Sequence, residues 1–157
     1  MKVLVVSDSH SYGHLLREVL LKEKDCPVVF HLGDGMREIE LEKDNFPEKK
    51  FIYVKGNNDW NSEGEYYAYK HIEGNTVIAT HGHLDRVNFS LYDLFSRAES
   101  VRANVALYGH THKQNMQYDS YSGVYAINPG ALCSGQYAVL TLTKDGVDVN
   151  FKRLSDF

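Results

Sequence analysis

The sequence predicts one mixed α/β domain that begins with alternating strands and helices and continues with β-hairpins. Three observations lead to this fold class. Short apolar runs alternate with a helical pattern in the first third of the chain. Three tight-turn signals, each flanked by β-favouring segments, follow later. The length of 157 residues suits a single core, because two domains of half that size would each bury too little surface.

In the first third, buried strands are expected at residues 2–7, 28–32 and 50–54, which are short and rich in Val, Ile and Phe. A helix is expected at 12–24, because four aliphatic side chains recur there at helical spacing. A short polar helix is expected at 38–43. This alternation favours parallel strands joined by right-handed crossovers.

The remainder of the chain is expected to be mainly antiparallel. Two-residue or three-residue turns containing Gly separate the members of each predicted hairpin. An amphipathic helix is expected at 91–101 and a short strand at 105–108. The predicted hairpin strands are residues 66–72 with 75–80, 116–121 with 124–127, and 137–143 with 147–152.

Composition excludes several classes of protein. A net charge of −4 argues against a stable complex with nucleic acid, which normally requires a basic face. Cys26 and Cys133 have no metal-binding or redox spacing, and we expect reduced thiols. The apolar run at the N-terminus is too short for a signal peptide or a membrane span. We therefore expect a cytoplasmic protein with no membrane partner.

Five polar clusters directly follow predicted strands. Ligands of open α/β sheets bind at the carboxyl ends of strands, so clusters in this position converge on one site. Each cluster alone is also typical of a turn, a helix cap or a solvated loop, and it is their combination that indicates function. The clusters are Asp8-Ser9-His10, Gly33-Asp34, Gly56-Asn57-Asn58-Asp59, Thr80-His81-Gly82-His83 and Gly109-His110-Thr111-His112.

The residue types in these clusters indicate a metal centre. Side chains at i and i+2 of an extended segment point to the same side, so each Asp-x-His or His-x-His pair presents two ligands together. Carboxylate, imidazole and amide groups without thiolate suit Mn²⁺, Fe, Zn²⁺ or Ni²⁺. Seven ligands are too many for one tetrahedral ion and suit two ions about 3.5–4 Å apart that share a carboxylate.

In their order, the clusters resemble the signature of the calcineurin-like metallophosphoesterase superfamily: D-x-H, G-D, G-N-x-[ED], G-H and G-H-x-H. All five parts are present between residues 8 and 112. The short chain and the Asn-Pro-Gly at 128–130 resemble the small bacterial and archaeal phosphodiesterases of the YfcE type. The resemblance implies a four-layer α-β-β-α sandwich of two mixed sheets, with the site at the strand ends.

The resemblance also implies roles for individual residues. Asp34 would bridge two divalent ions, with Mn²⁺ as the first choice and Ni²⁺, Fe, Zn²⁺ or Co²⁺ as alternatives. A hydroxide between the ions would attack the phosphorus of a small phosphodiester. One ion would be held by Asp8, His10, Asp34 and His112, and the other by Asp34, Asn57, His81 and His110.

The predicted catalytic residues are Asp34, Asn58, Asp59 and His83. Asn58 stands where many relatives place histidine, and asparagine cannot deliver a proton to the leaving group. We therefore expect better activity on good leaving groups, with His83 as the candidate proton donor. Asp59 would orient its own loop or a neighbouring histidine.

Two other functions share much of this pattern. A phosphomonoesterase, or an enzyme for phosphoanhydrides, would use the same ligands. A non-catalytic interaction module resembling the retromer subunit would not need all seven of them. Whether the chain forms a homo-oligomer is left open.

Several further side chains have no assigned role in the site. Arg86 and Arg97 suit a phosphate clamp, but nothing in the sequence places them there. The tyrosines, Tyr66 among them, suit either a sheet or base stacking. The remaining histidines are expected to be structural, and they are His14, His31 and His71.

Overall fold

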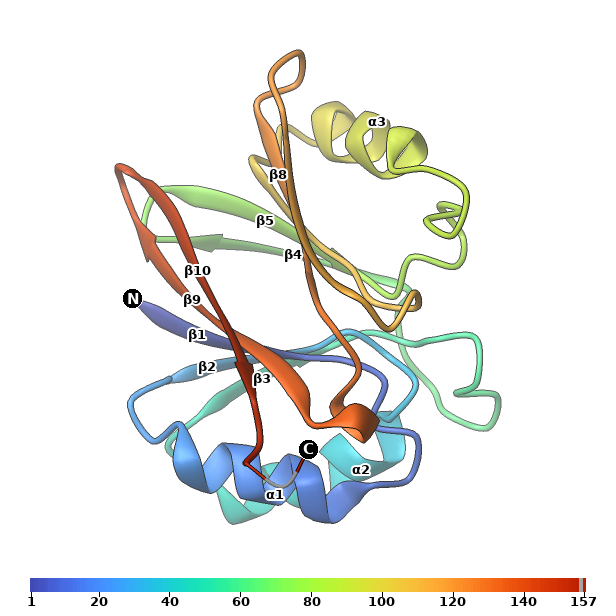
Figure 1. The fold of residues 1–157 in the computed structure, drawn as a ribbon, viewed down its shortest axis with the longest axis vertical. Helices are drawn as coiled ribbons and strands as arrows, with labels where there is room; N and C mark the ends of the chain where they lie inside the picture. Colours follow the sequence, from blue (N-terminus) through green and yellow to red (C-terminus); the bar gives the residue numbers. More distant parts are fainter. Residues whose placement is uncertain (156) are drawn as a thin grey trace.

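Two five-stranded sheets face each other, with helices on their outer sides (Figure 1). The computed structural model describes residues 1–155 and 157. Helices α1 and α2 cover the first sheet, the second sheet packs on its inner face, and α3 covers the far side. The predicted four-layer sandwich of two mixed sheets is confirmed.

The first sheet has the order β10-β9-β1-β2-β3. The strands β1, β2 and β3 are parallel, as their alternation with helices predicts. The hairpin of β9 and β10 joins this sheet by antiparallel pairing of β9 with β1. The strands are β1 (Lys2–Val6), β2 (Val28–His31), β3 (Lys50–Tyr53), β9 (Gln136–Thr143) and β10 (Gly146–Arg153).

The second sheet has the order β4-β5-β6-β8-β7. All three predicted hairpins form, but a mainly antiparallel second half is wrong for the centre of this sheet, where β5, β6 and β8 are parallel. The connection from β5 to β6 contains α3, which gives the long crossover that a parallel pair requires. The strands are β4 (Tyr67–Ile72), β5 (Asn75–Thr80), β6 (Val105–Leu107), β7 (Gln114–Asp119) and β8 (Val124–Pro129).

The three α-helices lie close to the segments where helices are expected, with shifted ends. They are α1 (Gly13–Lys22), α2 (Met36–Glu42) and α3 (Tyr92–Ser100), with 3₁₀ turns at Lys43–Asn45 and Leu132–Ser134. The second helix starts two residues before the predicted position, directly after Gly35. This early start brings the first turn of α2 next to the Gly33-Asp34 cluster.

The core follows from the alternation of side chains along buried strands. In β1, Val3 and Val5 face the second sheet, whereas Leu4 and Val6 face α1. All four are fully buried, which explains why this strand is an unbroken apolar run. Burial of a side chain of this size contributes roughly 1.5–3 kcal/mol, so both sheet faces stabilise the fold.

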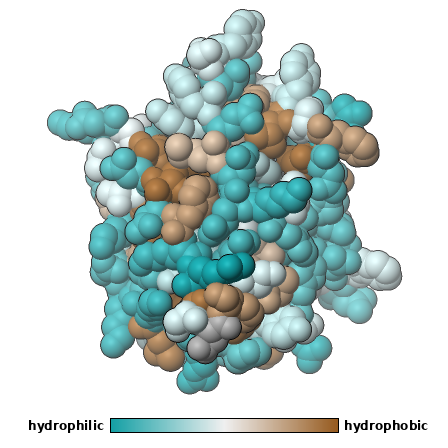
Figure 2. Space-filling model, viewed as in Figure 1, coloured by the Kyte–Doolittle hydropathy of each residue, from teal (hydrophilic) through white to brown (hydrophobic). Residues whose placement is uncertain are grey.

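The surface is mainly polar. The face drawn in Figure 2 is hydrophilic over most of its area, with smaller hydrophobic areas between. Among the described residues, every helix is too short or too polar to span a bilayer.

His31 ends β2 and is fully buried beneath the site. Its Nδ1 accepts the Gly33 N–H at 3.2 Å, which leaves the proton on Nε2, 3.0 Å from Ser9 Oγ. Burial lowers the pKa of His31 to about 4, although nearby carboxylates such as Asp59 oppose the shift. The neutral imidazole therefore joins the loop after β1 to the loop after β2.

We predict that His31 makes stability depend on pH below neutrality. The unfolded chain takes up this proton near pH 6.5 and the folded protein only near pH 4, so stability is lost as the pH falls through that window. The loss should reach about 3 kcal/mol, measured by urea unfolding of metal-free protein between pH 7.5 and 4.

The variant His31→Gln removes the titrating ring, and the exposed His71→Gln serves as the matched control. We expect a shallower pH dependence in His31→Gln and an unchanged one in His71→Gln. Equal slopes in wild type and His31→Gln would show that His31 does not carry this linkage.

Candidate metal centre

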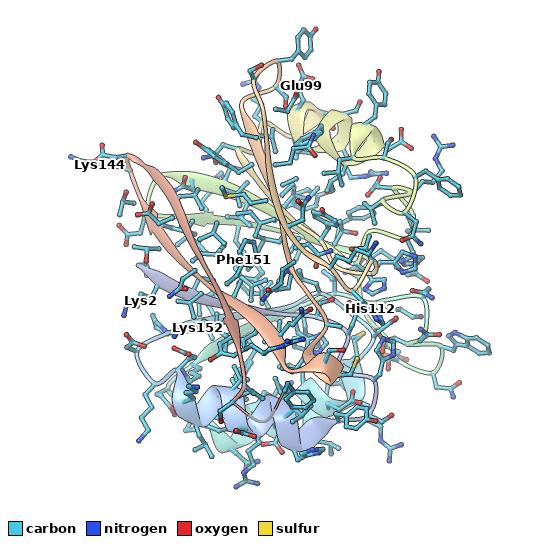
Figure 3. All side chains as sticks on the ribbon, in the orientation of Figure 1. Lys2, Glu99, His112, Lys144, Phe151 and Lys152 are labelled. Carbon is cyan, nitrogen blue, oxygen red and sulfur yellow. The ribbon has the colours of Figure 1, made fainter. Side chains whose placement is uncertain are left out.

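The five polar clusters meet at one edge, where the two sheets come together. Within the first sheet, the Asp8 N–H donates to Gly33 O and the His10 N–H donates to Asp34 O, both at 3.0 Å. The two sheets are joined at this edge by the His110 N–H, which donates to Asp8 Oδ2 at 3.1 Å. His112 lies on this side of the molecule in Figure 3, away from Lys144 at the opposite end.

The candidate ligands lie in tight turns rather than in extended segments. Asp8, His10, Asp34, His110 and His112 all have positive φ values, between 44° and 70°. The predicted extended backbone at the Asp-x-His and His-x-His pairs is therefore wrong, although their side chains do converge. Left-handed backbone at non-glycine residues costs about 1–3 kcal/mol each and gathers at functional sites. These turns aim side chains that would otherwise point away from one another.

Glycines allow the turns to pack closely. A Cβ on Gly56 would collide with the side chain and backbone of Asp34. A Cβ on Gly109 would collide with Ser7 Oγ and lie 2.8 Å from Asp8 Oδ2. The glycine before Asn57 and the one before His110 are thus required by close contact with the carboxylates.

Two buried carboxylates form the centre of the site. Asp8 is fully buried and Asp34 is 4% exposed. Asp8 Oδ1 lies 3.3 Å from His10 Nε2 and 3.1 Å from His112 Nε2. Asp34 Oδ2 lies 3.3 Å from His81 Nε2, which is also 3.8 Å from Asp8 Oδ1. The imidazoles of both sheets therefore surround the same two carboxylates.

The ring nitrogens point inward in two pairs. His10 Nε2 and His112 Nε2 are 3.2 Å apart, and so are His110 Nδ1 and His81 Nε2. His81 Nδ1 lies 2.7 Å from Leu32 O, which can only accept, so the proton is on Nδ1. Nε2 of His81 faces Asp34, and once it loses its proton its lone pair is free to bind a cation, the arrangement typical of metal-bound histidine.

Electrostatic interactions between the carboxylates and the imidazoles stabilise the charged forms of both. Burial raises the pKa of Asp8, but the hydrogen bond with His10 and the charge of His81 outweigh burial and leave the pKa lowered. Burial likewise raises the pKa of Asp34, and His81 and Asn58 more than reverse it. The hydrogen bond to Asp8 raises the pKa of His10. Burial lowers the pKa of His81, but the hydrogen bond with Asp34 outweighs burial and leaves the pKa raised. The two carboxylates thus favour the charged forms of His10 and His81 when no metal is bound.

This donor set fits divalent cations. Among the candidate ligands, two groups of ligand atoms lie within 4.8 Å of one another: Asp8, His10 and His112, and Asp8 with Asp34 and His81. Buried carboxylates with converging imidazole nitrogens and no thiolate match the preferences of Mn²⁺, Fe, Zn²⁺ and Ni²⁺. A cation there would replace the protons that the imidazoles otherwise carry.

The two asparagines of the third cluster are placed differently from each other. Asn58 donates to both oxygens of Asp34 at 2.8 Å, once from its backbone N–H and once from its side chain. Asn57 is exposed, and within the described residues its side chain has no hydrogen bond to the other candidate ligands. Six of the seven predicted ligands are brought together, and metal binding by these six, as by Asn57, stays a prediction.

Asp59 anchors the loop that carries both asparagines. Its carboxylate accepts four backbone N–H groups at 2.8–3.2 Å, and the donors are Asp34, Gly35, Met36 and Gly56. Asp59 therefore fixes the Asn57 loop against the start of α2, in line with the orienting role expected for it.

His83 lies at the rim beside the ligands, with its ring centroid 5.5 Å from that of His81 and 5.6 Å from that of Tyr66. Its Nδ1 is buried and has no hydrogen-bond partner in the described residues. Burial, followed by the charges of His81 and His110, lowers the pKa of His83. His83 is thus neutral at pH 7, which weakens it as a source of protons.

Two residues that the sequence did not single out lie at the site. Trp60 and Arg37 line the cleft beside His10 and Asp34. Arg86 and Arg97 suit a phosphate clamp by residue type, but both form ion pairs elsewhere, Arg86 with Asp93 and Arg97 with Asp85. In the sequence, Trp60 directly follows the Gly56–Asp59 cluster, and this position was a signal that it lies near the site. Nothing in the sequence indicates the same for Arg37.

Sequence comparison connects this geometry with known proteins. The family model of the calcineurin-like phosphoesterase superfamily domain matches residues 1–145. The probable metallophosphoesterase YsnB of Bacillus subtilis is 30% identical over 158 residues, covering 96% of this chain and 90% of its own. A predicted phosphoesterase from Streptococcus pneumoniae is similar in structure, with a TM-score of 0.82, 26% identity, and coverage of 97% of this chain and 88% of its own.

More distant structures share the fold alone. An archaeal phosphodiesterase has a TM-score of 0.71 at 22% identity and covers 97% of this chain and all of its own. Vps29 from Entamoeba histolytica, as a single mutant, has a TM-score of 0.74 at 17% identity and covers 99% of this chain and all of its own. From the match of the family model and the curated relative together, the chain belongs to the calcineurin-like phosphoesterase superfamily.

Proposed function

We propose that this phosphoesterase is a phosphodiesterase that depends on two divalent ions. The observation that carries the proposal is the convergence of two buried carboxylates and four imidazoles, from both sheets, on a space at the sheet edge. A single structural ion would need only four of these donors. When bound, a pair of ions supplies an acidic water and offsets charge on the phosphate.

The distances are compatible with two sets of donors that share Asp34. Asp34 Oδ2 lies 3.8 Å from His10 Nε2 and 3.3 Å from His81 Nε2, while His112 pairs with His10 and His110 with His81. We assign Asp8, His10, Asp34 and His112 to one ion and Asp34, Asn57, His81 and His110 to the other. Mn²⁺ is the first choice from the family resemblance and suits the carboxylate and amide oxygens, while the imidazoles suit the alternatives Fe, Ni²⁺ and Zn²⁺.

The chain's own polar groups would handle the substrate. Asn58 lies beside Asp34, where its amide can donate to a phosphate oxygen but cannot protonate a leaving group. The lowered pKa of His83 leaves it mostly unprotonated at pH 7, so little of it carries a proton to donate to a leaving group. Substrates whose leaving group needs no proton should therefore react fastest.

An open cleft favours diesters. The cleft beside Asp34 has a volume of about 390 Å³, within the usual range for ligand sites. Exposed residues such as Asn58 and Trp60 form its outer wall. A phosphate at the carboxylates thus has room for substituents on two sides, and the archaeal phosphodiesterase of similar fold is compatible with this reading.

Two alternative functions share parts of this site. A monoesterase would use the same ligands. An interaction module is suggested by the likeness to Vps29, but this likeness extends to the fold alone. The nearly complete set of converging donors favours an enzyme, because protein binding alone gives no reason to bury two carboxylates among imidazoles.

Metal replacement tests the proposal. Protein stripped with a chelator should be inactive and should regain hydrolysis of bis-p-nitrophenyl phosphate with Mn²⁺. Asp34→Asn should lower this activity by more than about 100-fold, since changes of even outer partners of metal ligands cost 10–100-fold. Asp145→Asn is the matched control, because Asp145 is exposed in the β9–β10 turn.

The substrates separate the alternatives. Faster turnover of p-nitrophenyl phosphate than of the diester would make the protein a monoesterase. No turnover of either by folded protein, with any of Mn²⁺, Ni²⁺, Zn²⁺ or Co²⁺, would contradict the enzyme and favour the interaction module.

Asn58→His tests the account of the leaving group. An imidazole at this position should raise turnover of a diester with an alkyl leaving group, such as glycerophosphocholine, by roughly tenfold or more, and should change p-nitrophenyl esters little. Asn58→Gln keeps an amide and is the matched control. If Asn58→His gains nothing on the alkyl diester, proton delivery is not what limits the wild type.

A further inference from the structure

The cleft beside the metal centre has an outer wall that the proposed metal ligands do not explain. One side is formed by His10 and Asp34. The other side is formed by the first turn of α2, with Arg37 and Glu38, and by the loop after β3, with Trp60. The two segments are held together by Asp59, which accepts N–H groups from both. The backbone of the outer wall is thus held by the same carboxylate that positions the Asp34 loop.

Trp60 is exposed in a way that folding does not explain. Its side chain is 80% exposed and belongs to none of the hydrophobic clusters of the described residues. Its Nε1–H donates to the Asn57 carbonyl at 2.5 Å, which holds one edge of the indole to the loop of a proposed ligand. A large planar side chain fixed at one edge and open to a cleft is a surface for stacking.

Arg37 is set apart by its place at the cleft rather than by its exposure. It is exposed and, within the described residues, has no carboxylate within 4.0 Å, as is also true of Arg17, Arg102 and Arg153, but none of those three lines this cleft. It also borders the adjoining groove along α1 and α2, so it lies at the outer end of the cleft rather than at the carboxylates. An unpaired guanidinium in this position suits a second anionic group.

The remaining polar groups of the wall limit the ligand further. Glu38 stands next to Arg37 in the cleft and would repel a ligand that is anionic along its whole length, such as a polyphosphate. Its carboxylate can instead accept hydrogen bonds from sugar hydroxyls. Asn61 and Ser62 add groups that both donate and accept. The wall therefore matches a ligand with an aromatic ring, hydroxyls and one separate anion.

We propose that Trp60 and Arg37 form a leaving-group subsite for a nucleotide, with the base stacked on the indole and a phosphate outside the reacting diester paired with the guanidinium. This proposal rests on the proposed diesterase activity and narrows its substrates to short nucleotide diesters, such as dinucleotides with a terminal phosphate. In hydrolysis, the oxygen of water would bond to the phosphorus, the P–O bond to the nucleotide would break, and the leaving oxygen would take its proton from water, because neither Asn58 nor His83 supplies one at pH 7. Binding by Trp60 and Arg37 would favour this leaving group by holding it in the cleft, although its departure is slower than that of a leaving group that needs no proton.

Fluorescence tests the subsite directly, because Trp60 is the only tryptophan of the chain. Full-length protein loaded with Zn²⁺ is titrated with adenosine 5′-monophosphate, adenosine and ribose 5-phosphate. We expect the monophosphate to quench the fluorescence, adenosine to do so at higher concentration, and ribose 5-phosphate to leave it nearly unchanged.

Variants separate the two contacts. Arg37→Gln should weaken binding of the monophosphate by roughly tenfold or more and leave adenosine binding unchanged, since only the charged contact is lost. Arg17→Gln, on the exposed side of α1, is the matched control. Trp60→Ala, assayed by hydrolysis of 5′-phosphorylated diadenylate, should lower kcat/KM roughly tenfold or more, whereas Trp60→Phe should retain more of it.

The outcomes distinguish this proposal from the proposed function. No quenching by either adenine compound, with bis-p-nitrophenyl phosphate still hydrolysed, would overturn the subsite alone. Quenching without hydrolysis of any diester would overturn the diesterase and leave a nucleotide-binding site. Equal binding of the monophosphate by wild type and Arg37→Gln would remove Arg37 from the proposal.

Discussion

Burial of Asp8 and Asp34 side by side, where the two sheets meet, is the constraint on which the rest of the site depends. An ionised carboxylate removed from water costs several kcal/mol unless other groups compensate it. Compensation comes from both sheets: the His110 N–H and the Ser7 hydroxyl bind Asp8, while Asn58 and His81 serve Asp34. The loops at this edge are shaped by that requirement, with left-handed turns at five candidate ligands and glycines where the backbone must approach a carboxylate.

One short loop combines several tasks of the proposed enzyme. Asn57 is the proposed amide ligand, Asn58 contacts Asp34, Asp59 ties the loop to α2, and Trp60 faces the cleft. In the proposed enzyme, four consecutive residues would thus connect metal binding, phosphate contact, rigidity and recognition of the leaving group. Because Asp59 holds both this loop and the first turn of α2, the ligands and the outer wall of the cleft share one anchor.

Much of this arrangement could be predicted from the sequence, because the relation between strand ends and ligands is local. A buried strand followed at once by Asp8 or Asp34 places the carboxylate at the sheet edge whatever the rest of the fold does. The turn geometry could not be predicted, because the left-handed conformation of His10 depends on contacts with the next loop. The place of Arg37 in the cleft could not be predicted either, because it depends on where α2 begins. Its lack of an ion-pair partner depends on charges that are distant in the sequence.

The central claim, that Asp34 is shared by two divalent ions, is tested most directly by counting and coupling Mn²⁺. Equilibrium dialysis followed by metal analysis should give two Mn²⁺ per chain, and electron paramagnetic resonance should show the exchange-coupled spectrum of a bridged pair about 3.5–4 Å apart. In Asp34→Asn, the coupling should disappear. One ion per chain, or two ions with independent spectra in the wild type, would contradict a shared carboxylate and with it the two-metal account.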